Sequence, residues 1–492
     1  MIINFLNDKE RKQIGFNYIL DKLIILTPFG YEEKKNLRPF LKHEKLLLIK
    51  EYNNIKTIIT KMESNKKIFH DIERILFKFK DIRNSIIRCK NLAILDEVEL
   101  YEIKVFSMLI EDLRILLNRL KLDIDEIDLF SLEKVVELLD PENKRMPTFH
   151  IYEAYSFNLK QIREKKRHIE KEIFAVTDPE TLEKLKLERL DIVIMEEEEE
   201  LKIKKEISEK LSFEAEKIEK NIKMIGRLDF LIAKAKLAVE YNCSKPIISE
   251  VNEIKIKNMF NPEVFEILKL HNKKFTPVSL EIKSGTTIIT GANMGGKTVA
   301  LKTLVLNLLT GTMGFFVFAE KAEFPIFDFI YFVSDDLQSV LKGLSSFGAE
   351  IIKLKEILLD VKTNTGLIVL DEFAKGTNPK EGFFLVKAVS GYLNRFSSVT
   401  VISTHYDGIV SDEMIHYQVI GLKHANFEEI KRKINLKKSN SIEIIQEYMD
   451  YNLEKITSNH EVPKDALNIS MLLGLDEDII NLAKSYYEEE EK

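Results

Sequence analysis

The chain has 492 residues, which is too long for one compact domain and leaves room for two to four. Hydrophobic residues make up 45% of it and charged residues 31%, enough apolar material for real cores beneath a well-solvated surface. The formal net charge of -6 argues against a dedicated non-specific DNA binder, because such proteins are more often basic.

Cysteine usage and the N-terminus narrow the class further. Cys89 and Cys243 lie far apart and no CxxC occurs, so neither a disulfide framework nor a zinc site is indicated. The first residues soon turn charged, unlike a signal peptide, and no apolar run reaches the roughly 18 to 20 residues that cross a bilayer. These features predict a cytoplasmic protein with no membrane partner.

Residues 1–157 are predicted to be helical. Ile14, Ile19 and Leu23 have close to i, i+4 spacing, and a break is expected at Thr27-Pro28-Phe29-Gly30. Residues 158–222 then consist almost entirely of strong helix formers and charges. Their one interruption offers Asp178 as an N-cap and Pro179 as a first helical residue. The pattern predicts an antiparallel hairpin of two long helices.

The hairpin carries one run of five acids, Glu196 to Glu200, which we interpret as a solvated helix face. Its one basic cluster spans residues 163–168, from Arg163 to His168. Useful affinity for DNA needs several phosphate contacts, so this cluster would give weak, salt-sensitive binding. The alternative is that it is a solvated face with partners one helical turn away.

Residues 251–435 differ, because short apolar runs now alternate with helical stretches. The runs suit strands buried on both faces of a mostly parallel sheet, and they are Thr287–Ile289, Phe315–Phe318, Leu367–Leu370 and Val399–Ile402. This region is predicted to be an α/β domain. The tail after about residue 435 is predicted to return to helix.

One of these strands leads directly into a phosphate-binding loop that matches GxxxxGK[ST]. The glycines let backbone N–H groups turn toward phosphate oxygens, and the N-terminus of the following helix adds partial positive charge. We expect Lys297 at the β- and γ-phosphates of ATP and the Thr298 hydroxyl on Mg²⁺. The residues predicted to bind the nucleotide here are Gly291, Ala292, Asn293, Met294, Gly295, Gly296, Lys297, Thr298 and Val299.

A second acidic motif follows the strand Leu367–Leu370, which ends in Asp371-Glu372. The carboxyl end of a buried strand beside a phosphate loop is where a Mg²⁺-associated carboxylate belongs. Asp371 is predicted to hold the ion, through water. Glu372 is predicted to accept a proton from the attacking water, or to orient it.

These residues resemble the MutS family. Thr290–Thr298 is similar to the MutS phosphate loop TGPNMGGKS, with Asn293-Met294 as the distinctive pair and Ala292 in place of Pro. Leu370–Gly382 resembles the LDELGxGT segment, and its GTxPxEG ending is typical of the MutS2 branch. Ser403-Thr404-His405-Tyr406 matches the family's T-H-Y, which implies that His405 takes part in catalysis as a γ-phosphate sensor.

Two further site residues are implied by the resemblance. The segment Asp336–Glu350 is similar to the MutS2 pattern DxQS…LSTF, which implies that Ser345 crosses a dimer interface to the partner's nucleotide. Phe275 matches the aromatic residue that stacks on adenine, with packing in a core as the alternative.

The resemblance implies a multidomain architecture. Its parts are an all-α core and lever at 1–157, a clamp-like antiparallel hairpin at 158–222, a return helix of the core at 223–250, an α/β P-loop ATPase domain of the ABC type at 251–435 and a C-terminal helical dimerisation element at 436–492. The chain starts at the core and ends at Lys492. We therefore expect neither the family's mismatch-reading domain nor the nuclease-like domain of MutS2.

The resulting function is a Mg²⁺-dependent ATP hydrolase, a homodimer that couples ATP binding and hydrolysis to clamp opening and closing. By resemblance its cargo is DNA, bound by structure without mismatch readout. A protein partner is the other open hypothesis: the acidic hairpin would then be the arm of an accessory or remodelling factor for a metabolic enzyme such as an aminomutase. A module that binds ATP and hardly hydrolyses it is a third, disfavoured by the intact Asp371, Glu372 and His405.

Overall fold

The computed structural model describes residues 5–146, 148–291, 296–334, 346–437, 441–456 and 465–490. The predicted nucleotide-binding residues Ala292, Asn293, Met294, Gly295 and Ser345 lie outside these ranges. Within them, no helix combines the length and the apolar character that crossing a bilayer requires.

The chain divides into two compact units. The helical unit comprises Ile24–Leu37 and Asn54–Ala235, and the sheet unit comprises Met1–Leu23, Arg38–Asn53 and Lys236–Lys492. The domains predicted from the sequence are consecutive ranges of the chain, whereas each of these units combines segments that are distant in sequence. The predicted domain boundaries therefore stay predictions.

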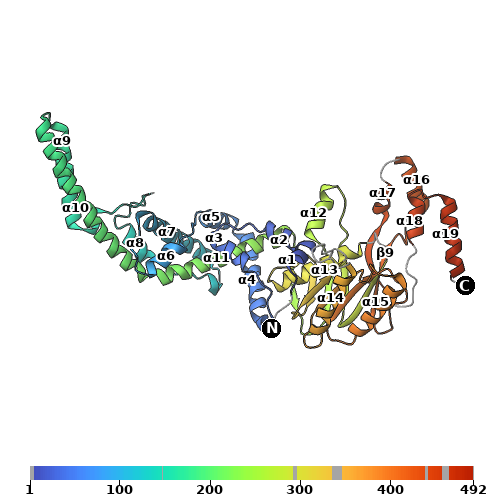
Figure 1. Cartoon of the computed structure of the whole chain (residues 1–492). Helices are drawn as coiled ribbons and strands as arrows, with labels where there is room; N and C mark the ends of the chain where they lie inside the picture. The colour runs from blue at the N-terminus through green and yellow to red at the C-terminus, as the bar shows by residue number, and fades with distance from the viewer. Residues whose placement is uncertain are drawn as a thin grey trace. The chain divides into compact units, whose positions relative to one another are not determined.

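Helices account for all the regular structure of the helical unit in the part of the chain that the structure describes (Figure 1). Two helices, α4 (Lys45–Ser64) and α11 (Ala215–Glu240), contribute residues to both units. The remaining elements are α3 (Pro28–Lys35), α5 (Lys66–Leu76), α6 (Arg83–Lys90), α7 (Glu97–Leu120), η2 (Asp125–Ile127), α8 (Glu133–Leu139), η3 (Glu153–Tyr155), α9 (Phe157–Ala175) and α10 (Pro179–Ser212).

The predicted break at Thr27 is the start of helix α3. The Thr27 hydroxyl caps this helix by accepting the Gly30 N–H at 2.9 Å, and Pro28 is the first helical residue. Asp229 of α11 accepts the Thr27 N–H at 2.7 Å, the Thr27 hydroxyl at 2.8 Å and the Leu26 N–H at 3.1 Å. Burial raises the pKa of Asp229 above its ordinary value, against the opposing effect of these hydrogen bonds. The buried carboxylate of Asp229 thus holds the first residues of α3 against α11.

Replacing Asp229 by alanine is expected to destabilise the helical unit by about 2–4 kcal/mol, because two backbone N–H groups and a hydroxyl lose their buried acceptor. Urea unfolding followed by far-UV circular dichroism measures the change. Asp123→Ala, at an exposed position of the same unit, is the matched control. Equal unfolding midpoints for the two variants would contradict the role of Asp229.

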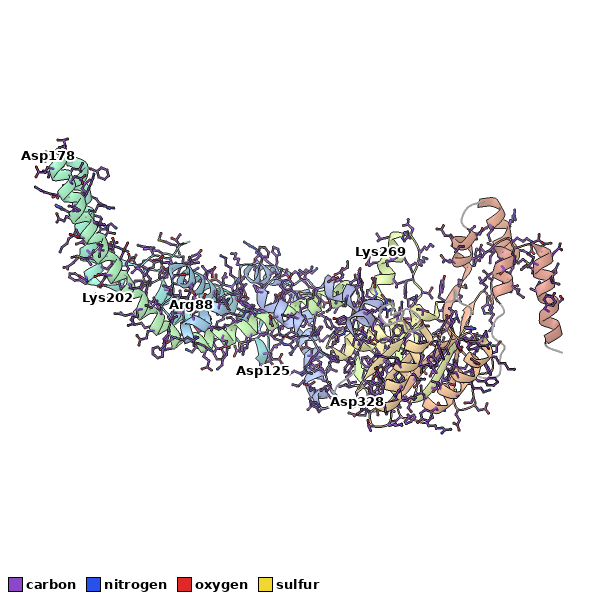
Figure 2. All side chains as sticks on the ribbon, viewed as in Figure 1. Arg88, Asp125, Asp178, Lys202, Lys269 and Asp328 are labelled. Carbon is purple, nitrogen blue, oxygen red and sulfur yellow. The ribbon has the colours of Figure 1, made fainter. Side chains whose placement is uncertain are left out.

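Helices α9 and α10 form the predicted hairpin, and Figure 2 labels Asp178 at its turn. Ile162 and Ile169 of α9 and Ile192 of α10 share a buried cluster between the helices. Asp178 accepts the Thr181 N–H at 3.0 Å, and Pro179 opens α10, so both end signals are confirmed.

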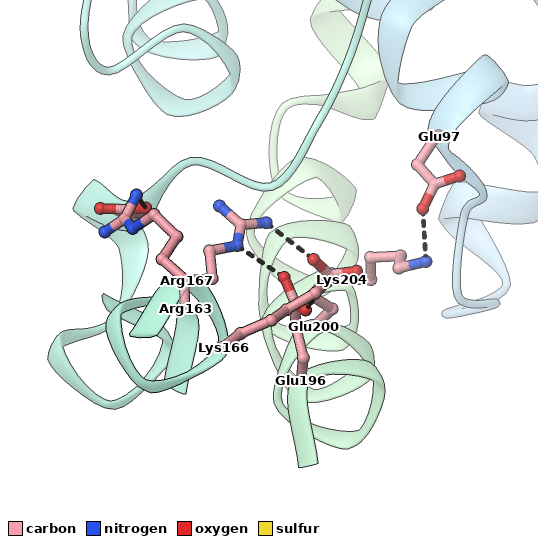
Figure 3. A network of polar contacts seen from close by, with 8 residues as sticks. Glu97, Arg163, Lys166, Arg167, Glu196, Glu200 and Lys204 are labelled. Carbon is pink, nitrogen blue, oxygen red and sulfur yellow. Dashed lines mark hydrogen bonds and ion pairs between the residues drawn. The ribbon is translucent and has the colours of Figure 1, made fainter. Parts of the chain in front are cut away.

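The interpretation of Glu196–Glu200 as a solvated face is wrong for part of the run. Glu196 is buried and accepts hydrogen bonds from Arg163, at 2.9 Å, and from Lys166. Glu200 accepts a second bond from Arg163 at 2.7 Å (Figure 3). Helical periodicity turns every third or fourth acid toward α9, where the basic cluster lies. Of the five glutamates in this run, only Glu197 and Glu198 are exposed.

The sheet unit contains a six-stranded sheet in the order β10-β9-β4-β8-β7-β6. Its strands are parallel except for β10, which pairs antiparallel with β9, so the mostly parallel sheet is confirmed. Strands β4, β7 and β8 are buried along their whole length, which suits their β-branched apolar sequences. The bounds are β4 (Gly285–Thr290), β6 (Ile330–Val333), β7 (Leu367–Asp371), β8 (Val399–Thr404), β9 (Ile415–Gly421) and β10 (Asp450–Ile456).

A second sheet and several helices complete the unit. The four-stranded sheet has the order β1-β5-β2-β3, with β1 (Ile247–Ile248), β2 (Ile254–Met259), β3 (Val278–Ile282) and β5 (Lys321–Phe324). The helical elements are α1 (Asp8–Gln13), α2 (Phe16–Lys22), η1 (Lys42–Glu44), α12 (Pro262–Leu270), α13 (Lys297–Thr312), α14 (Ser346–Asp360), α15 (Pro379–Leu393), α16 (Phe427–Lys437), α17 (Ser441–Tyr448), α18 (Asp465–Leu472) and α19 (Glu477–Glu490).

Two secondary-structure predictions in this unit are wrong. The run Phe315–Phe318 is buried but forms only an isolated bridge between Val317 and Ser244, and the Phe318 ring packs edge-on against Tyr241. The predicted helical tail contains strand β10, an edge strand in which charged residues are as many as the apolar ones that would mark it.

Candidate functional site

The predicted catalytic residues meet at one edge of the six-stranded sheet. Thr290, the last residue of β4, pairs with Thr404 of β8, and Asp371, the last residue of β7, pairs with Ser403. Because the three strands are parallel, the residues that follow them leave the sheet on the same side. Gly291, Glu372 and His405 are those residues.

Both described ends of the phosphate loop require glycine. Gly291 has φ 140° and Gly296, which precedes α13, has φ 81°, a region that side chains with a Cβ rarely adopt. A Cβ on Gly291 would lie 2.9 Å from the Val419 Cβ, and one on Gly296 would lie 2.9 Å from a Tyr451 ring carbon. The loop therefore passes close to β9 and β10 at its two ends.

Lys297 is buried at the start of α13. Its ammonium donates to the Gly291 carbonyl at 2.6 Å and lies 3.6 Å from Glu372 Oε1. Burial lowers its pKa below the ordinary value, against the opposing effect of Glu372. The cation is thus held between the loop backbone and a carboxylate, where an anionic phosphate would compete for it.

Asp371 is buried at the end of β7 and accepts the Ser403 hydroxyl at 2.6 Å. The Thr298 hydroxyl also bonds to this carboxylate. Burial raises the pKa of Asp371, and the two hydroxyl hydrogen bonds lower it by less, so the pKa ends above its ordinary value. The carboxylate and the two hydroxyl groups together make a compact set of oxygen atoms.

Glu372 lies in the left-handed region with φ 51°, which is uncommon outside glycine. Its N–H donates to the Ser403 hydroxyl oxygen at 2.9 Å, and its carboxylate accepts from Lys375 at 2.6 Å. Burial raises the pKa of Glu372 most, but the Lys375 hydrogen bond and the charges of Lys297 and Lys375 together outweigh it, so the pKa ends below its ordinary value. The side chain is therefore an ionised carboxylate at neutral pH.

A second left-handed residue, Ala374 with φ 61°, follows two positions later. Its N–H donates to the buried carboxylate of Glu350 at 2.9 Å. Left-handed non-glycine residues persist where surrounding contacts determine the backbone, and they cluster at functional sites. The turn after β7 is such a place.

His405 follows β8, and its ring lies against Tyr406 with the centroids 4.4 Å apart. Burial lowers the pKa of His405 most, while Glu372 raises it, and the net pKa lies below the ordinary value. The imidazole is therefore neutral at neutral pH and offers one N–H donor and one acceptor.

The other predicted residues are less closely tied to this cluster. Val299 lies in the first turn of α13, where its carbonyl accepts the Thr303 hydroxyl at 2.6 Å. Phe275 is partly buried in the segment that joins α12 to β3, and no ring contact connects it to another aromatic residue in the part of the chain that the structure describes. Its adenine-stacking role stays a prediction.

Sequence reasoning gave no role to several residues that shape the site. Along the sequence, Ser403 stands only in the segment that matches T-H-Y, and Lys375 only in the segment Leu370–Gly382. His416 of β9, whose Nε2 lies 2.8 Å from the Thr290 hydroxyl, and Tyr451 beside Gly296 were not singled out. Strand pairing brings Ser403 and His416 to the site, and that signal is not available along the sequence, whereas Lys375 lies only three residues after Glu372.

The side chains present fit ATP with Mg²⁺. Magnesium prefers oxygen ligands, usually one or two from the protein together with water and phosphate. The Asp371 carboxylate and the Thr298 hydroxyl, already hydrogen-bonded to each other, are such a pair. The buried Lys297 ammonium supplies a positive charge for phosphate oxygens.

Comparison with known proteins agrees with this site. A family model described as MutS domain V matches residues 287–485, which include Lys297, Asp371 and His405. MutS domain V is an ATPase domain. The motif residues therefore lie in the part of the chain that the family model covers.

Curated relatives named Endonuclease MutS2 match a larger part. That of Caldanaerobacter subterraneus subsp. tengcongensis is 29% identical over 305 residues, 60% of this chain and 35% of that protein. That of Ruminiclostridium cellulolyticum is 31% identical over 295 residues, 58% of this chain and 33% of that protein. That of Acetivibrio thermocellus is 34% identical over 219 residues, which are 44% of this chain and 27% of that protein. The match spans about a third of these relatives' length or less. Residues 287–485 of the chain thus match MutS domain V, and the chain is similar to MutS2 proteins.

Proposed function

We propose that this chain binds and hydrolyses ATP with Mg²⁺ at the carboxyl ends of β4, β7 and β8. The observation that carries the proposal is the convergence of Lys297, Asp371, Glu372 and His405 at that one edge of the sheet. The match to MutS domain V, an ATPase domain, supports it.

Each side chain has a distinct task in this proposal. Lys297 binds the β- and γ-phosphate oxygens, and the phosphate loop supplies backbone N–H donors around them. Asp371 and Thr298 hold Mg²⁺, which when bound neutralises charge on the phosphate oxygens. Glu372, ionised at neutral pH, accepts the proton of the attacking water. His405, neutral, donates its N–H toward the γ-phosphate.

The quaternary part of the proposal is a homodimer in which Ser345 of one protomer completes the site of the other. The C-terminal helix α19 supports a dimerisation role, because Ile479, Leu482 and Tyr486 are exposed at helical spacing on it. ATP binding would then close the dimer, and hydrolysis would reopen it.

The cargo is tested by the rate of ATP hydrolysis with duplex, mismatched and four-way-junction DNA, at low and moderate salt. DNA that acts through the hairpin should raise the rate, and the effect should shrink as salt rises. Because Arg163 and Lys166 are already bonded to Glu196, we expect no stimulation by any of these DNAs. A chelator should abolish hydrolysis; turnover that survives it would contradict the Mg²⁺-dependent site.

Lys375→Ala is expected to move the acid limb of the pH–rate profile to higher pH. The lysine lowers the pKa of Glu372, so its removal raises that pKa and protonates the base at a pH where the unchanged protein still works. The rate at neutral pH should change little. Lys362→Ala, an exposed lysine beyond the end of α14, is the control. Superimposable profiles for the two variants would show that Lys375 does not tune the base.

A further inference from the structure

Helix α10 has an apolar row on the side that does not pack against α9. Leu187, Leu190, Ile194 and Leu201 follow one another at intervals of three, four and seven residues. Their side chains are 64%, 54%, 47% and 53% exposed. At helical spacing they lie along one line about 20 Å long, which we call the outer stripe. A single exposed leucine needs no explanation, but a row of this kind marks an interaction surface.

Three acidic residues flank the outer stripe. By helical periodicity Asp191, Glu197 and Glu198 fall on the same face. All three are exposed, and none has a hydrogen bond or ion pair in the part of the chain that the structure describes. Nearer the turn, Glu180 and Glu183 are paired with Lys184 and Lys186 of the same helix. The stripe is therefore apolar along its centre and negatively charged at its margins.

The negative charge at the margins of the outer stripe indicates which kind of partner can bind there. A second copy of the stripe would place Asp191, Glu197 and Glu198 opposite the same acids in a parallel pair, or opposite one another in an antiparallel pair about Ile194, and like charges repel. DNA phosphates would be repelled in the same way, and Arg163 and Lys166 of α9 are engaged with Glu196 and Glu200.

We propose that the outer stripe binds an amphipathic basic helix of a protein partner. That helix would present a row of leucine, isoleucine or methionine at i, i+3/i+4, i+7 spacing, flanked by lysine and arginine, over at least about 15 residues. The apolar row gives affinity by burial, and the lysines and arginines meet Asp191, Glu197 and Glu198 at the margin. The proposal goes beyond ATP hydrolysis and does not depend on it.

A synthetic helical peptide tests the surface with the full chain. The probe is a fluorescent peptide of about 18 residues with leucines on one face and lysines on the other, followed by fluorescence anisotropy. We expect saturable binding that weakens as salt rises. Ile194→Asp, and Glu197→Lys combined with Glu198→Lys, should each raise Kd by at least about tenfold. A peptide with glutamate in place of lysine should not bind.

Matched controls use exposed side chains of the same hairpin outside the stripe. Phe174 is 91% exposed on α9, and Glu164 is exposed on the same helix. Phe174→Asp and Glu164→Lys should leave Kd unchanged. Circular dichroism of each variant confirms that the hairpin is folded, which is expected because every substituted side chain faces solvent.

Four outcomes would overturn the proposal. They are equal losses in stripe and control variants, absence of peptide binding, duplex DNA binding that is lost in Ile194→Asp, and a molecular mass in solution that halves in Ile194→Asp, which would make a second copy the occupant. Binding is measured without ATP, whereas the proposed hydrolysis is judged by turnover, so the failure of one leaves the other standing.

Discussion

Replacing Glu372 by glutamine is expected to lower the rate of ATP hydrolysis by about 10²- to 10⁴-fold, the usual contribution of a general base. The amide keeps the size of the side chain but cannot accept the proton of the attacking water. ATP should still bind, because Lys297 and the phosphate loop are unchanged. Steady-state turnover and nucleotide binding by calorimetry, measured on the same preparation, separate the two effects.

The control for this variant is Glu356→Gln, an exposed glutamate of α14 in the same unit. Its turnover should match that of the unchanged chain. If Glu372→Gln hydrolyses ATP at the original rate, another group accepts the proton, and the neutral imidazole of His405 becomes the candidate to replace next.

Lys297→Met should weaken ATP binding by about 10- to 150-fold, which is the loss of one charge-assisted hydrogen bond to phosphate. The methionine fills the buried space without the charge. The same change removes a cation 3.6 Å from Glu372, so the pKa of that carboxyl should rise as well. Isothermal titration calorimetry measures the affinity, and Lys362→Met is the exposed-lysine control. Unchanged affinity would remove Lys297 from the phosphate site.

The Lys297→Met variant also tests the proposed dimer. If Ser345 completes the partner's site, mixed dimers of Lys297→Met and Ser345→Ala protomers contain one site with neither defect. An equimolar mixture should then recover about a quarter of the original rate, since half the dimers are mixed and each has one intact site of two. No recovery on mixing would count against a composite site.

Local signals predicted much of the site. The phosphate loop is defined by eight consecutive residues, and Asp371-Glu372 by the strand that precedes it, so both can be read along the chain. That they meet follows from a general property of parallel sheets, whose strands end at one edge. The end signals of the hairpin, Asp178 and Pro179, are local in the same sense.

What the sequence did not disclose depends on the register between distant segments. Arg163 bonds to Glu196 because α9 and α10 pack in one particular register. No local pattern specifies which of the five adjacent glutamates face α9. Ser403 reaches Asp371 because β7 and β8 pair at those residues. Strand β10 is defined by the neighbour it pairs with more than by its own composition.

The Ser403 hydroxyl has a consequence for how this site can vary. It donates to the Asp371 carboxylate at 2.6 Å and accepts the Glu372 N–H at 2.9 Å. One rotatable bond therefore sets the orientation of the proposed ion-holding group and the backbone of the proposed base together. A substitution at this position is therefore expected to change the metal preference of the proposed site and its rate of turnover together.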